Sequence, residues 1–314
     1  MELIKLQPTP IQKMNVDLNQ NTFYIKRDDL LPISFGGNKV RKAKLFFEDL
    51  LQQEANCVVT YGSSSSNHCR IIANIAAAKG IVCHIISPSE TGSRTTNQKI
   101  IELFNAYVTN CSISEVSKTI EDKMNELRSQ GYHPYFIQGG GHGDLGTQAY
   151  VDAYQEILDY EKATGLHFDY IFHTSGTGTT QAGLICGQIL NHDERKIIGI
   201  SNARRNPYGS QVVLDSVNSY LENNNKKEVT IESVNFVDDY ILQGYGSYDE
   251  RILITIRDVL RYEGIPLDPV YTGKAFWGMK EYIKANQILL KNILFIHTGG
   301  TPLFFDKLEE LIHG

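Results

Sequence analysis

The sequence predicts an α/β protein built as an open parallel sheet with helices on both of its faces. Short apolar runs rich in β-branched residues recur along the chain, too short for helices and lacking polar alternation, as is typical of parallel strands. Stretches with helical periodicity lie between these runs, and strand–helix alternation is the pattern of such sheets. The segments that follow the strands are rich in Gly, Ser and Thr.

The expected strands and helices can be read in order along the chain. The strand-like runs are CVVT (57–60), IVCHIIS (81–87), PYFIQ (134–138), YIFHTSG (170–176), KIIGIS (196–201) and NILFIHTGG (292–300). Helices are expected at NHCRIIANIAAAKG (67–80), QKIIELFNAY (98–107) and QAGLICGQIL (181–190). In the first of these, Ile71, Ile72, Ile75 and Ala76 share one face, and Gly80 is a natural residue to end the helix.

Four strand endings predict a binding site. They are TYGSSSSN (60–67), QGGGHGDLG (138–146), TSGTGTT (174–180) and HTGGTP (297–302). Open parallel sheets bind ligands beyond the carboxyl ends of their strands. Each ending alone could be a plain connector, but together they indicate one shared cleft.

Composition excludes several classes of protein. The 314 residues carry a net charge of −6 and no basic tract, which argues against a nucleic-acid partner. No apolar run is long enough for a bilayer, and the N-terminal residues lack the apolar core of a signal peptide, so a cytoplasmic protein without membrane contact is expected. The five scattered cysteines indicate buried thiols, and no histidine spacing predicts a metal site.

The segment HTSGTGTTQAGL (173–184) has the features of a phosphate-binding loop. A strand runs into Ser175–Thr180, and a helix follows. Glycines allow backbone N–H groups to converge, and the helix N-terminus and Thr hydroxyls add positive potential and donors. No Gly-Lys-Ser/Thr closes the loop as in a Walker A motif. The next strand ends in Ser201-Asn202, where a dinucleotide site would have an acidic residue, and the loop has no lysine, so a small monophosphate is favoured over a dinucleotide. A plain connecting turn is the other alternative.

Lys39 stands at an unusual place, after Gly36-Gly37-Asn38 and at the start of the helix NKVRKAKLFFEDLL (38–51). Neighbouring cations and a helix N-terminus both lower the pKa of an ammonium group, which makes the amine nucleophilic. We interpret Arg41, Lys42 and Lys44 as a solvated basic face. A nucleophilic lysine together with a phosphate loop predicts a Schiff base to pyridoxal 5′-phosphate.

Five motifs resemble one known family. IKRDDLLPISFGGNKVRKAK (25–44), SSSNH (64–68), TSGTGTTQAGL (174–184), EGIPLDPVYTGKAFWGM (263–279) and FIHTGGTP (295–302) are similar to the pyridoxal-phosphate enzymes grouped as 1-aminocyclopropane-1-carboxylate deaminase and D-cysteine desulfhydrase. The resemblance runs from about residue 8 to 305. It implies the tryptophan-synthase-β-like fold (PLP fold type II), with the cofactor in the cleft between two open-sheet α/β domains: a large cofactor domain of residues 1–45 and 148–314 and a small covering domain of residues 46–147.

The resemblance also implies roles for single residues. Lys39 would form the Schiff base, Asn67 would bind the 3′-oxygen of the pyridine ring, and Thr298 would face the ring nitrogen. The phosphate would lie on a loop made of Thr177, Gly178, Thr179 and Thr180. Ser65, Ser66, Asn67, His68, His142 and Thr272 would bind the substrate, whose carboxylate suits the helix start at Asn67. For His68 the alternative is a helix-capping residue without chemistry.

Two tyrosines and their neighbours decide the expected reaction. Tyr271 matches the family's catalytic tyrosine and Tyr245 a second one at the active site. Ring-opening members have glutamate after the catalytic tyrosine, whereas Thr272 is the desulfhydrase pattern. Lys274 is expected in a loop, with a structural role. The resemblance therefore implies β-elimination from a small D-amino acid, with D-cysteine giving pyruvate, ammonia and sulfide, in a homodimer.

Two departures from the family concern the substrate. Ser65 replaces the usual glutamine, and the usual GGSN loop reads GGGHG, with Gly141 and His142. A relative acting on another D- or β-substituted amino acid is therefore one alternative. The others are a 1-aminocyclopropane-1-carboxylate deaminase, a pyridoxal-phosphate binder without turnover and a dinucleotide-binding oxidoreductase.

Overall fold

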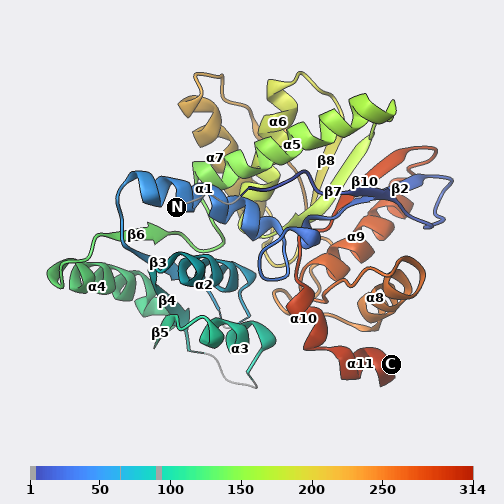
Figure 1. The fold of residues 1–314 in the computed structure, drawn as a ribbon. Helices are drawn as coiled ribbons and strands as arrows, with labels where there is room; N and C mark the ends of the chain where they lie inside the picture. Colours follow the sequence, from blue (N-terminus) through green and yellow to red (C-terminus); the bar gives the residue numbers. More distant parts are fainter. Residues whose placement is uncertain (1–4, 64, 90–93, 314) are drawn as a thin grey trace. The chain divides into compact units, whose positions relative to one another are not determined.

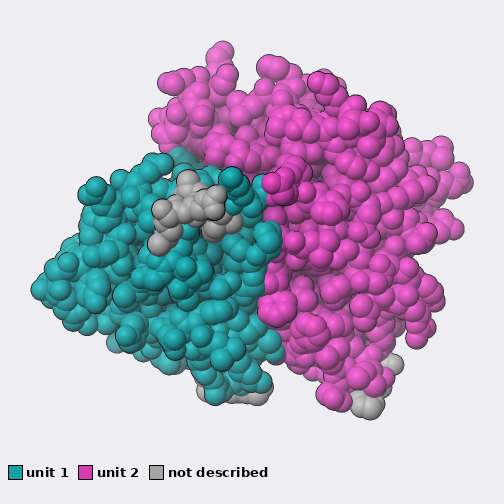
Figure 2. Space-filling model, in the orientation of Figure 1, with its two compact units in different colours: residues 1–6, 32–34, 39–146 teal, residues 7–31, 35–38, 147–314 magenta. Residues whose placement is uncertain are grey.

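The computed structural model describes residues 5–63, 65–89 and 94–313, and the chain divides into two compact units. The smaller unit contains residues 1–6, 32–34 and 39–146. The larger contains residues 7–31, 35–38 and 147–314, and Figure 2 colours the two units separately. Each unit has its own β-sheet.

The elements alternate along most of the chain (Figure 1). The strands are β1 (Ile11–Lys13), β2 (Thr22–Lys26), β3 (Cys57–Tyr61), β4 (Val82–Pro88), β5 (Tyr107–Cys111), β6 (Pro134–Ile137), β7 (Tyr170–Ser175), β8 (Lys196–Ser201), β9 (Asn235–Val237) and β10 (Asn292–Ile296). The helices are α1 (Asn38–Gln52), α2 (Asn67–Lys79), α3 (Thr96–Leu103), α4 (Val116–Ser129), α5 (Asp144–Thr164), α6 (Thr179–Leu190), α7 (Tyr208–Asn223), α8 (Glu250–Glu263), α9 (Thr272–Ala285), α10 (Thr301–Phe305) and α11 (Leu308–His313). Short 3₁₀ turns lie at Asp28–Leu30, Ile113–Glu115 and Ile231–Ser233.

The larger unit is built on a six-stranded sheet in the order β1-β2-β10-β7-β8-β9. All neighbours are parallel except β1 and β2, which form an antiparallel pair at one edge. The N-terminal strand β2 thus lies beside β10, from the far end of the chain. The parallel arrangement brings the carboxyl ends of β7 and β10 to one edge of the sheet.

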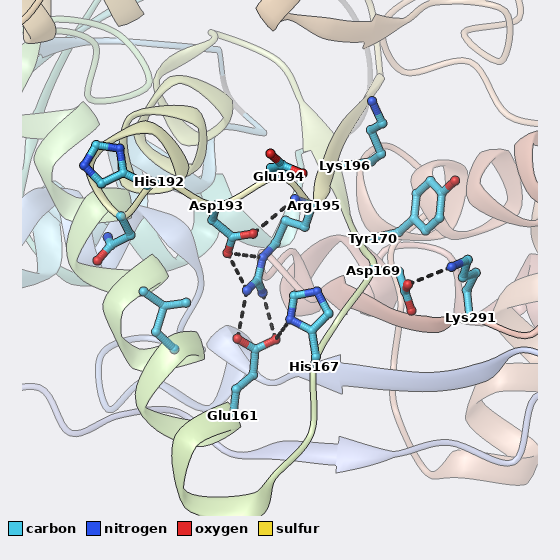
Figure 3. A pocket seen from close by; sticks show the side chains of 12 residues that line it. Glu161, His167, Asp169, Tyr170, His192, Asp193, Glu194, Arg195, Lys196 and Lys291 are labelled. Atoms are coloured by element: carbon cyan, nitrogen blue, oxygen red, sulfur yellow. Dashed lines mark hydrogen bonds and ion pairs between the residues drawn. The ribbon is translucent and has the colours of Figure 1, made fainter.

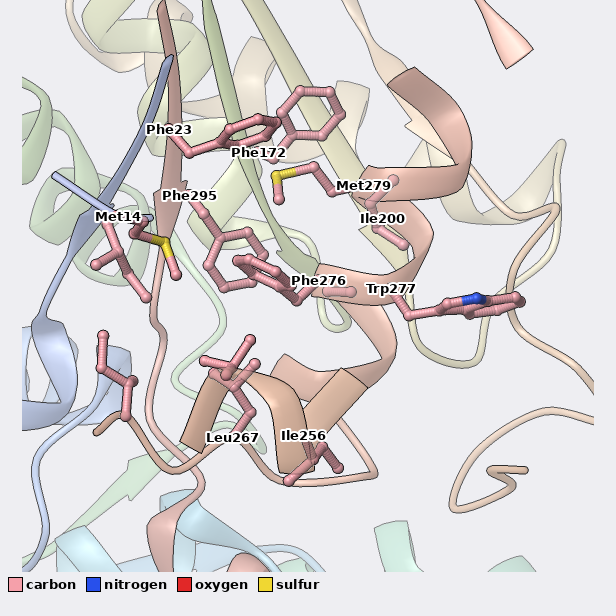
Figure 4. Close-up of a cluster of buried hydrophobic side chains, with 14 of the residues drawn as sticks. Met14, Phe23, Phe172, Ile200, Ile256, Leu267, Phe276, Trp277, Met279 and Phe295 are labelled. Atoms are coloured by element: carbon pink, nitrogen blue, oxygen red, sulfur yellow. The ribbon is translucent and has the colours of Figure 1, made fainter. Parts of the chain in front are cut away.

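Helices cover both faces of this sheet because alternate strand residues point to opposite sides. On one face, Phe172 and Phe295 pack with α8 and α9 in a core that includes Phe276 and Met279 (Figure 4). On the other face, the neighbouring positions, among them Ile171 and Leu294, pack against α5, α6 and α7. The sheet is therefore buried on both sides, as the apolar runs predict.

The smaller unit has a four-stranded parallel sheet in the order β5-β4-β3-β6. Cys57 and Val59 of β3 and Ile86 of β4 form one face and pack against α4 through Leu127. Helix α2 contacts β3 and β4 as well. β3 and β6 are neighbours, so the segments that follow them leave the same edge of the sheet.

All six expected strands and all four expected helices are present, and Gly80 ends α2 in the left-handed conformation. The helix expected over 98–107 ends at Leu103, and Tyr107 instead begins β5. The predicted α/β class is therefore confirmed. Burial on both faces is wrong for β6, an edge strand in which Phe136 is 36% exposed. The five cysteines are free, four of them buried and Cys111 partly so. Within the described residues, none of the helices combines the length and apolar character that crossing a bilayer requires.

Phe276 provides a test of the core. It is 1% exposed and meets Phe295 edge to face, with ring centroids 5.1 Å apart. We expect Phe276→Ala to lower the free energy of unfolding by about 3–5 kcal/mol, because the large cavity cannot close fully. Phe305→Ala, at a position 48% exposed, is the control and should change it by less than about 1 kcal/mol. Equal effects in urea unfolding would contradict the described packing.

Candidate active site

The start of α1 is held by a close backbone contact. Gly37 has φ +104°, and a Cβ atom there would lie 2.8 Å from the carbonyl oxygen of Thr298. Its N–H donates to Asp28 O at 2.7 Å, and the next N–H, that of Asn38, donates to Thr298 O at 2.9 Å. Only glycine fits this conformation and this space. The two glycines before Lys39 therefore bring the helix start against the end of β10.

Asn38 also ties the helix start to the predicted phosphate loop. Its Nδ2 donates to Thr180 Oγ1 at 3.1 Å. Asn38 thus contacts the segments that follow β7 and β10, two of the four Gly-rich strand endings. Lys39 is the next residue in the chain.

The predicted phosphate loop joins β7 directly to α6. Gly178 precedes the helix with φ +106°, and Thr179 and Thr180 form its first turn and are buried. Thr177 is half-buried, and Ser175 Oγ donates to Gln181 Oε1 at 2.8 Å. The backbone N–H groups of this first turn have no carbonyl within the helix. The expected strand–glycine–helix geometry of an anion site is therefore present.

Lys39 has the lowered pKa that a nucleophilic amine needs. Its side chain is half-buried, and burial lowers its pKa to about 8. Its Nζ donates one hydrogen bond, to Gly140 O at 2.9 Å. Gly140 belongs to the Gly-rich segment after β6. The expected lowering is present, but its cause is burial rather than neighbouring cations.

The expectation of a solvated basic face on α1 is wrong for two of its three members. Arg41 is 4% and Lys42 1% exposed, whereas Lys44 is half-buried and pairs with Glu48 at 2.6 Å. A Cβ atom on Gly141 would lie 3.2 Å from Lys42 Cβ and Cδ. Burial and the charge of Lys39 hold the pKa of Lys42 well below its usual range. The spacing of three residues, which gives Lys39 and Lys42 one helix face, was the available signal.

The start of α2 presents Asn67 in a fixed orientation. Ser66 caps the helix, its Oγ accepting from Cys69 N–H at 3.2 Å. Asn67 Oδ1 accepts from Arg70 Nη1 at 2.6 Å and from Asn97 Nδ2 at 3.0 Å. The helix start expected at Asn67 is therefore confirmed. Neither Arg70 nor Asn97 was identified from the sequence.

His68 is buried, and its tautomer follows from its partner. Its Nε2 lies 2.8 Å from Thr60 Oγ1, which itself donates to Ile137 O at 2.8 Å. Thr60 has one hydroxyl proton, so the imidazole Nε2–H must be the donor to Thr60. Burial, and then the charges of Lys39 and Lys42, hold the pKa of His68 well below 6.5. His68 is thus a neutral ring whose Nδ1 is an acceptor.

Two further predicted substrate residues lie on the same unit. Ser65 Oγ is 3.2 Å from Ser63 Oγ, and Ser65 O accepts from Asn97 Nδ2 at 2.7 Å. His142 is half-buried in the turn between β6 and α5. The segments that follow β3 and β6 therefore carry all four residues, Ser65 in a loop, Asn67 and His68 at the start of α2 and His142 in a turn, and these segments leave neighbouring strands. A shared cleft for all four strand endings stays a prediction, because the other two belong to the other unit's sheet.

The two predicted tyrosines are hydrogen-bonded to each other. The hydroxyl oxygens of Tyr245 and Tyr271 are 2.7 Å apart, and the rings meet edge to face with centroids 6.0 Å apart. Tyr245 is 50% exposed, and Tyr271 directly precedes α9. The residues lie on separate segments of the chain, so this pairing supports placing both in one site.

Lys274 lies in the first turn of α9, so the expected loop is wrong at this position. Its Nζ donates to three carbonyl oxygens, those of Gly244 (2.9 Å), Ile241 (3.2 Å) and Asn202 (3.3 Å). Burial lowers its pKa to about 8, as for Lys39. All three N–H groups of Lys274 have carbonyl partners, and two of these belong to the loop that carries Tyr245. Such contacts fit the structural role expected for Lys274.

Thr272 is fully buried and bound to Asp268. Its hydroxyl donates to Asp268 Oδ2 at 2.8 Å, and Asp268 N–H donates to Thr272 Oγ1 at 3.0 Å. Burial raises the pKa of Asp268. An added Cβ on Gly300 would collide with the Asp268 carboxylate, so this group lies beside the segment after β10 that carries the buried Thr298.

A cavity of about 680 Å³ lies elsewhere on the larger unit (Figure 3). It is lined by residues at the amino ends of β7, β8 and β10, including Asp169, Lys196 and Lys291. The buried Arg195 in its wall is held by Glu161 and Asp193 at 2.9 and 2.5 Å. It is at the opposite ends of these strands from the predicted cofactor loops and does not correspond to that site.

The sequence matches the family described as "Pyridoxal-phosphate dependent enzyme" over residues 4–299. Among curated proteins, it is 32% identical over 307 residues to D-cysteine desulfhydrase of Serratia proteamaculans, covering 95% of this chain and 92% of the relative. It is 33% identical over 313 residues to D-cysteine desulfhydrase of Klebsiella pneumoniae, covering 95% and 93%.

Solved structures also include a homologue of the ACC deaminases among the proteins similar to this chain. A structure described as an ACC deaminase homologue superposes with a TM-score of 0.87 at 31% identity, covering 99% of this chain and 94% of that one. A hydrogen sulfide-producing enzyme from Fusobacterium nucleatum superposes with a TM-score of 0.64 at 18% identity, covering 94% and 96%, a likeness of fold alone. The tryptophan-synthase-β-like arrangement expected from the sequence is confirmed at the level of fold class.

The tautomer of His68 is directly measurable. Because burial and the nearby lysine charges depress its pKa, we expect the ring to be neutral, with the proton on Nε2, even at pH 6.5, where a free imidazole is half charged. Nitrogen-15 spectra of the imidazoles resolve this. Thr60→Val removes the acceptor and should abolish the preference for the Nε2 proton. A protonated Nδ1, or a charged ring at pH 7, would contradict the assignment.

Proposed function

Because the chain belongs to the family of pyridoxal-phosphate-dependent enzymes, we propose that it is a lyase that eliminates the β-substituent of a small D-amino acid, with D-cysteine as the leading substrate. The observation that carries the proposal is Lys39, whose pKa is lowered to about 8 and whose Nζ makes a single hydrogen bond. Membership in this enzyme family overturns the alternatives of a dinucleotide-binding oxidoreductase and of a binder without turnover.

The residues fit the cofactor. An aldehyde needs an amine that is partly uncharged at neutral pH, and a pKa of about 8 leaves about a tenth of the Lys39 amine in that form at pH 7. A monophosphate needs N–H donors without internal partners, and the first turn of α6 supplies them. Thr174 Oγ1, in β7 just before this loop, is buried and has no partner within the described residues, so it adds a hydroxyl donor.

We assign the cofactor contacts as follows. In the larger unit, Thr177, Gly178, Thr179 and Thr180 would hold the phosphate and Thr298 would lie near the ring nitrogen. In the smaller unit, Lys39 would form the covalent bond and Asn67 would bind the 3′-oxygen. When bound, the cofactor would supply an electron-withdrawing ring that stabilises negative charge on the substrate's Cα. The neutral Thr298 hydroxyl would stabilise a protonated ring nitrogen less than a carboxylate would.

The chain's own groups then bind the substrate and move its protons. The start of α2, capped by Ser66, offers backbone N–H groups to the substrate carboxylate, with Ser65 and His68 on either side. His68 is neutral, so it adds no charge beside this anion. His142 lies in the loop after β6, which also contacts Lys39 through Gly140. This loop contributes to the choice of the substrate's side chain.

Lys39 and the tyrosine pair are the proton-transfer groups. A lysine amine with a pKa of about 8 can accept the proton from Cα near neutral pH. The 2.7 Å hydrogen bond between Tyr245 and Tyr271 lets the pair share a proton, so that Tyr271 can donate to the departing thiolate while Tyr245 stabilises the remaining charge. Lys274 holds the loop that carries Tyr245 through hydrogen bonds to the carbonyls of Gly244 and Ile241.

Thr272 separates this reaction from the opening of a cyclopropane ring. Its hydroxyl proton is bound to Asp268, so this position supplies neither a free acid nor a carboxylate. Elimination of a good leaving group needs less stabilisation of the carbanion than ring opening does. A 1-aminocyclopropane-1-carboxylate deaminase is therefore the second candidate. A different D- or β-substituted amino acid is the third, favoured by Ser65 and His142.

The test is a panel of D- and L-amino acids, assayed for keto acid and ammonia. D-Cysteine and one water should give one pyruvate, one ammonia and one sulfide, and β-chloro-D-alanine should give chloride in place of sulfide. 1-Aminocyclopropane-1-carboxylate should turn over at least about 10²-fold more slowly, the loss typical of one misplaced catalytic group. Comparable turnover of the cyclopropane substrate, or activity confined to L-amino acids, would refute the assignment.

Covalent labelling tests the choice of lysine. We expect borohydride reduction of the holoenzyme to fix the pyridoxyl group on Lys39. Lys39 and Lys274 both have a pKa of about 8, but the three N–H groups of Lys274 donate to three carbonyls, whereas Lys39 donates to one. Peptide mapping locates the label. Lys39→Ala should lose it, and Lys274→Met should keep it on Lys39. A label on Lys274 would overturn the assignment.

Tyr271→Phe separates catalysis from cofactor binding. The variant keeps the ring packing and should bind the cofactor as the native protein does. Its turnover of D-cysteine should fall by about 10²–10⁴-fold, the usual contribution of a positioned acid or base. Tyr282→Phe, in the helix α9 that Tyr271 precedes and partly buried against the core, is the matched control and should turn over normally. Native turnover by Tyr271→Phe would leave this tyrosine a packing role.

We also propose a cytoplasmic homodimer with a large cofactor domain and a small covering domain. The division expected from the sequence is 1–45 and 148–314 against 46–147, whereas residues 39–45 belong to the smaller compact unit. Free thiols at all five cysteines support a reducing compartment. Sedimentation equilibrium of the holoenzyme tests the dimer.

A further inference from the structure

A buried polar network in the smaller unit lies behind Asn67. Arg70 of α2 and Asn97 of α3 are both 0% exposed. Arg70 Nη1 donates to Asn67 Oδ1 and to Asn97 Oδ1, each at 2.6 Å. Asn97 Nδ2 donates to Asn67 Oδ1 at 3.0 Å and to Ser65 O at 2.7 Å. Hydrogen bonds offset part of the cost of burying such polar groups, so the contacts through Arg70 Nη1 and the two amides hold these side chains in fixed positions.

These contacts allow one orientation for each amide. A guanidinium has no acceptor, so the Asn97 atom facing it is the oxygen. Asn97 Nδ2 then faces Ser65 O and Asn67, and both donors directed at Asn67 require its oxygen there. Asn67 Nδ2 is left on the opposite side of the carboxamide, where it donates to no atom among the described residues. The network therefore leaves Asn67 Nδ2 available to donate a hydrogen bond to a group that is not part of the chain, such as a bound ligand.

We propose that Arg70 and Asn97 are positioning residues that fix the Asn67 carboxamide so that its Nδ2 donates to the 3′-oxygen of the cofactor. The proposal rests on the proposed function, in which Asn67 binds this oxygen. It adds two residues that touch neither substrate nor cofactor. Asn97 brings α3 into the site and also holds the carbonyl of Ser65.

The network affects the strength of the hydrogen bond as well as its direction. Asn67 Oδ1 accepts from a guanidinium and from an amide, and such chains polarise one another, which makes Nδ2 a stronger donor. A donor to the 3′-oxygen stabilises the anionic form of that oxygen. It thereby lowers the pKa of the proton that the bound cofactor shares between this oxygen and the Lys39 nitrogen. Loss of the donor must raise that pKa.

Lys39 and Lys42 of α1 and His68 and Cys69 of α2 are titratable groups of the same unit, His68 is neutral, and no variant below removes any of them. Arg70→Met removes a charge, whereas Asn97→Ala changes none, so Asn97→Ala isolates the effect of positioning. Burial lowers the pKa of Arg70 to about 9, so it stays charged below that pH.

The experiment is a pH titration of the visible absorption band of the holoenzyme. Asn67→Ala should raise the midpoint by about one pH unit, the effect of losing one hydrogen bond to a charged form. Arg70→Met and Asn97→Ala should raise it in the same direction. Arg70→Lys, which keeps a charged donor, should restore most of the native midpoint. Asn21→Ala removes a buried amide of the larger unit that contacts Leu18 O and Ile288 O, and it should leave the midpoint unchanged.

The double variants distinguish positioning from general support. In the Asn67→Ala background, Asn97→Ala should add no further shift, because its effect passes through Asn67. Asn97→Ala also keeps the test valid if Arg70→Met does not fold. The proposal is overturned if Asn67→Ala shifts the midpoint and neither Arg70→Met nor Asn97→Ala does, or if the shifts add. A native protein without a visible band would instead overturn the proposed function itself.

Discussion

The contact between the backbone of Gly37 and the end of β10 fixes the candidate active site of the larger unit. This contact involves backbone atoms alone. The N–H of Asn38 donates to Thr298 O, and Gly37 lies so close to the same oxygen that a Cβ atom on residue 37 would collide with it. Backbone contacts of this kind leave little freedom. Asn38 then reaches Thr180 in the phosphate loop, so the residue before Lys39 is bound to two of the predicted cofactor segments.

Three buried or half-buried lysines show that a lysine with a lowered pKa can have either a chemical or a structural role. Burial lowers the pKa of Lys39, Lys42 and Lys274 alike. What differs is the supply of acceptors, because Lys274 donates to three carbonyls whereas Lys39 donates to one. An ammonium whose three N–H groups all donate hydrogen bonds is stabilised in its charged form and is a poor nucleophile, so Lys274 holds a loop in place. A lowered pKa alone therefore identifies neither a nucleophile nor a structural lysine.

The sequence predicted the strands and helices whose apolar pattern is local. It predicted fewer of the contacts that depend on packing between distant segments. Most of the buried strands have apolar runs and were identified. β2 was missed although it is buried between β1 and β10. The exposed edge strand β5 and the three-residue strands β1 and β9 lack such runs and were also missed. The burial of Lys42 follows from its spacing to Lys39 and was available in principle. Arg70, three residues after Asn67, was equally readable, but Asn97 lies on another element and no spacing reveals it. The position of Lys274 was assigned to a loop because the preceding proline obscured the start of α9.

The place of β2 in its sheet has a consequence for biosynthesis. β2 pairs on one side with β1 and on the other with β10, which follows it by about 270 residues. At ribosomal rates of about 5–20 residues per second, the N-terminal strand waits roughly 15–50 s for its neighbour to be made. The sheet that supports Asn38 closes only after that. The proposed attachment of the cofactor at Lys39 would therefore follow the synthesis of β10, and a nascent chain truncated before β10 would lack the sheet that supports Asn38.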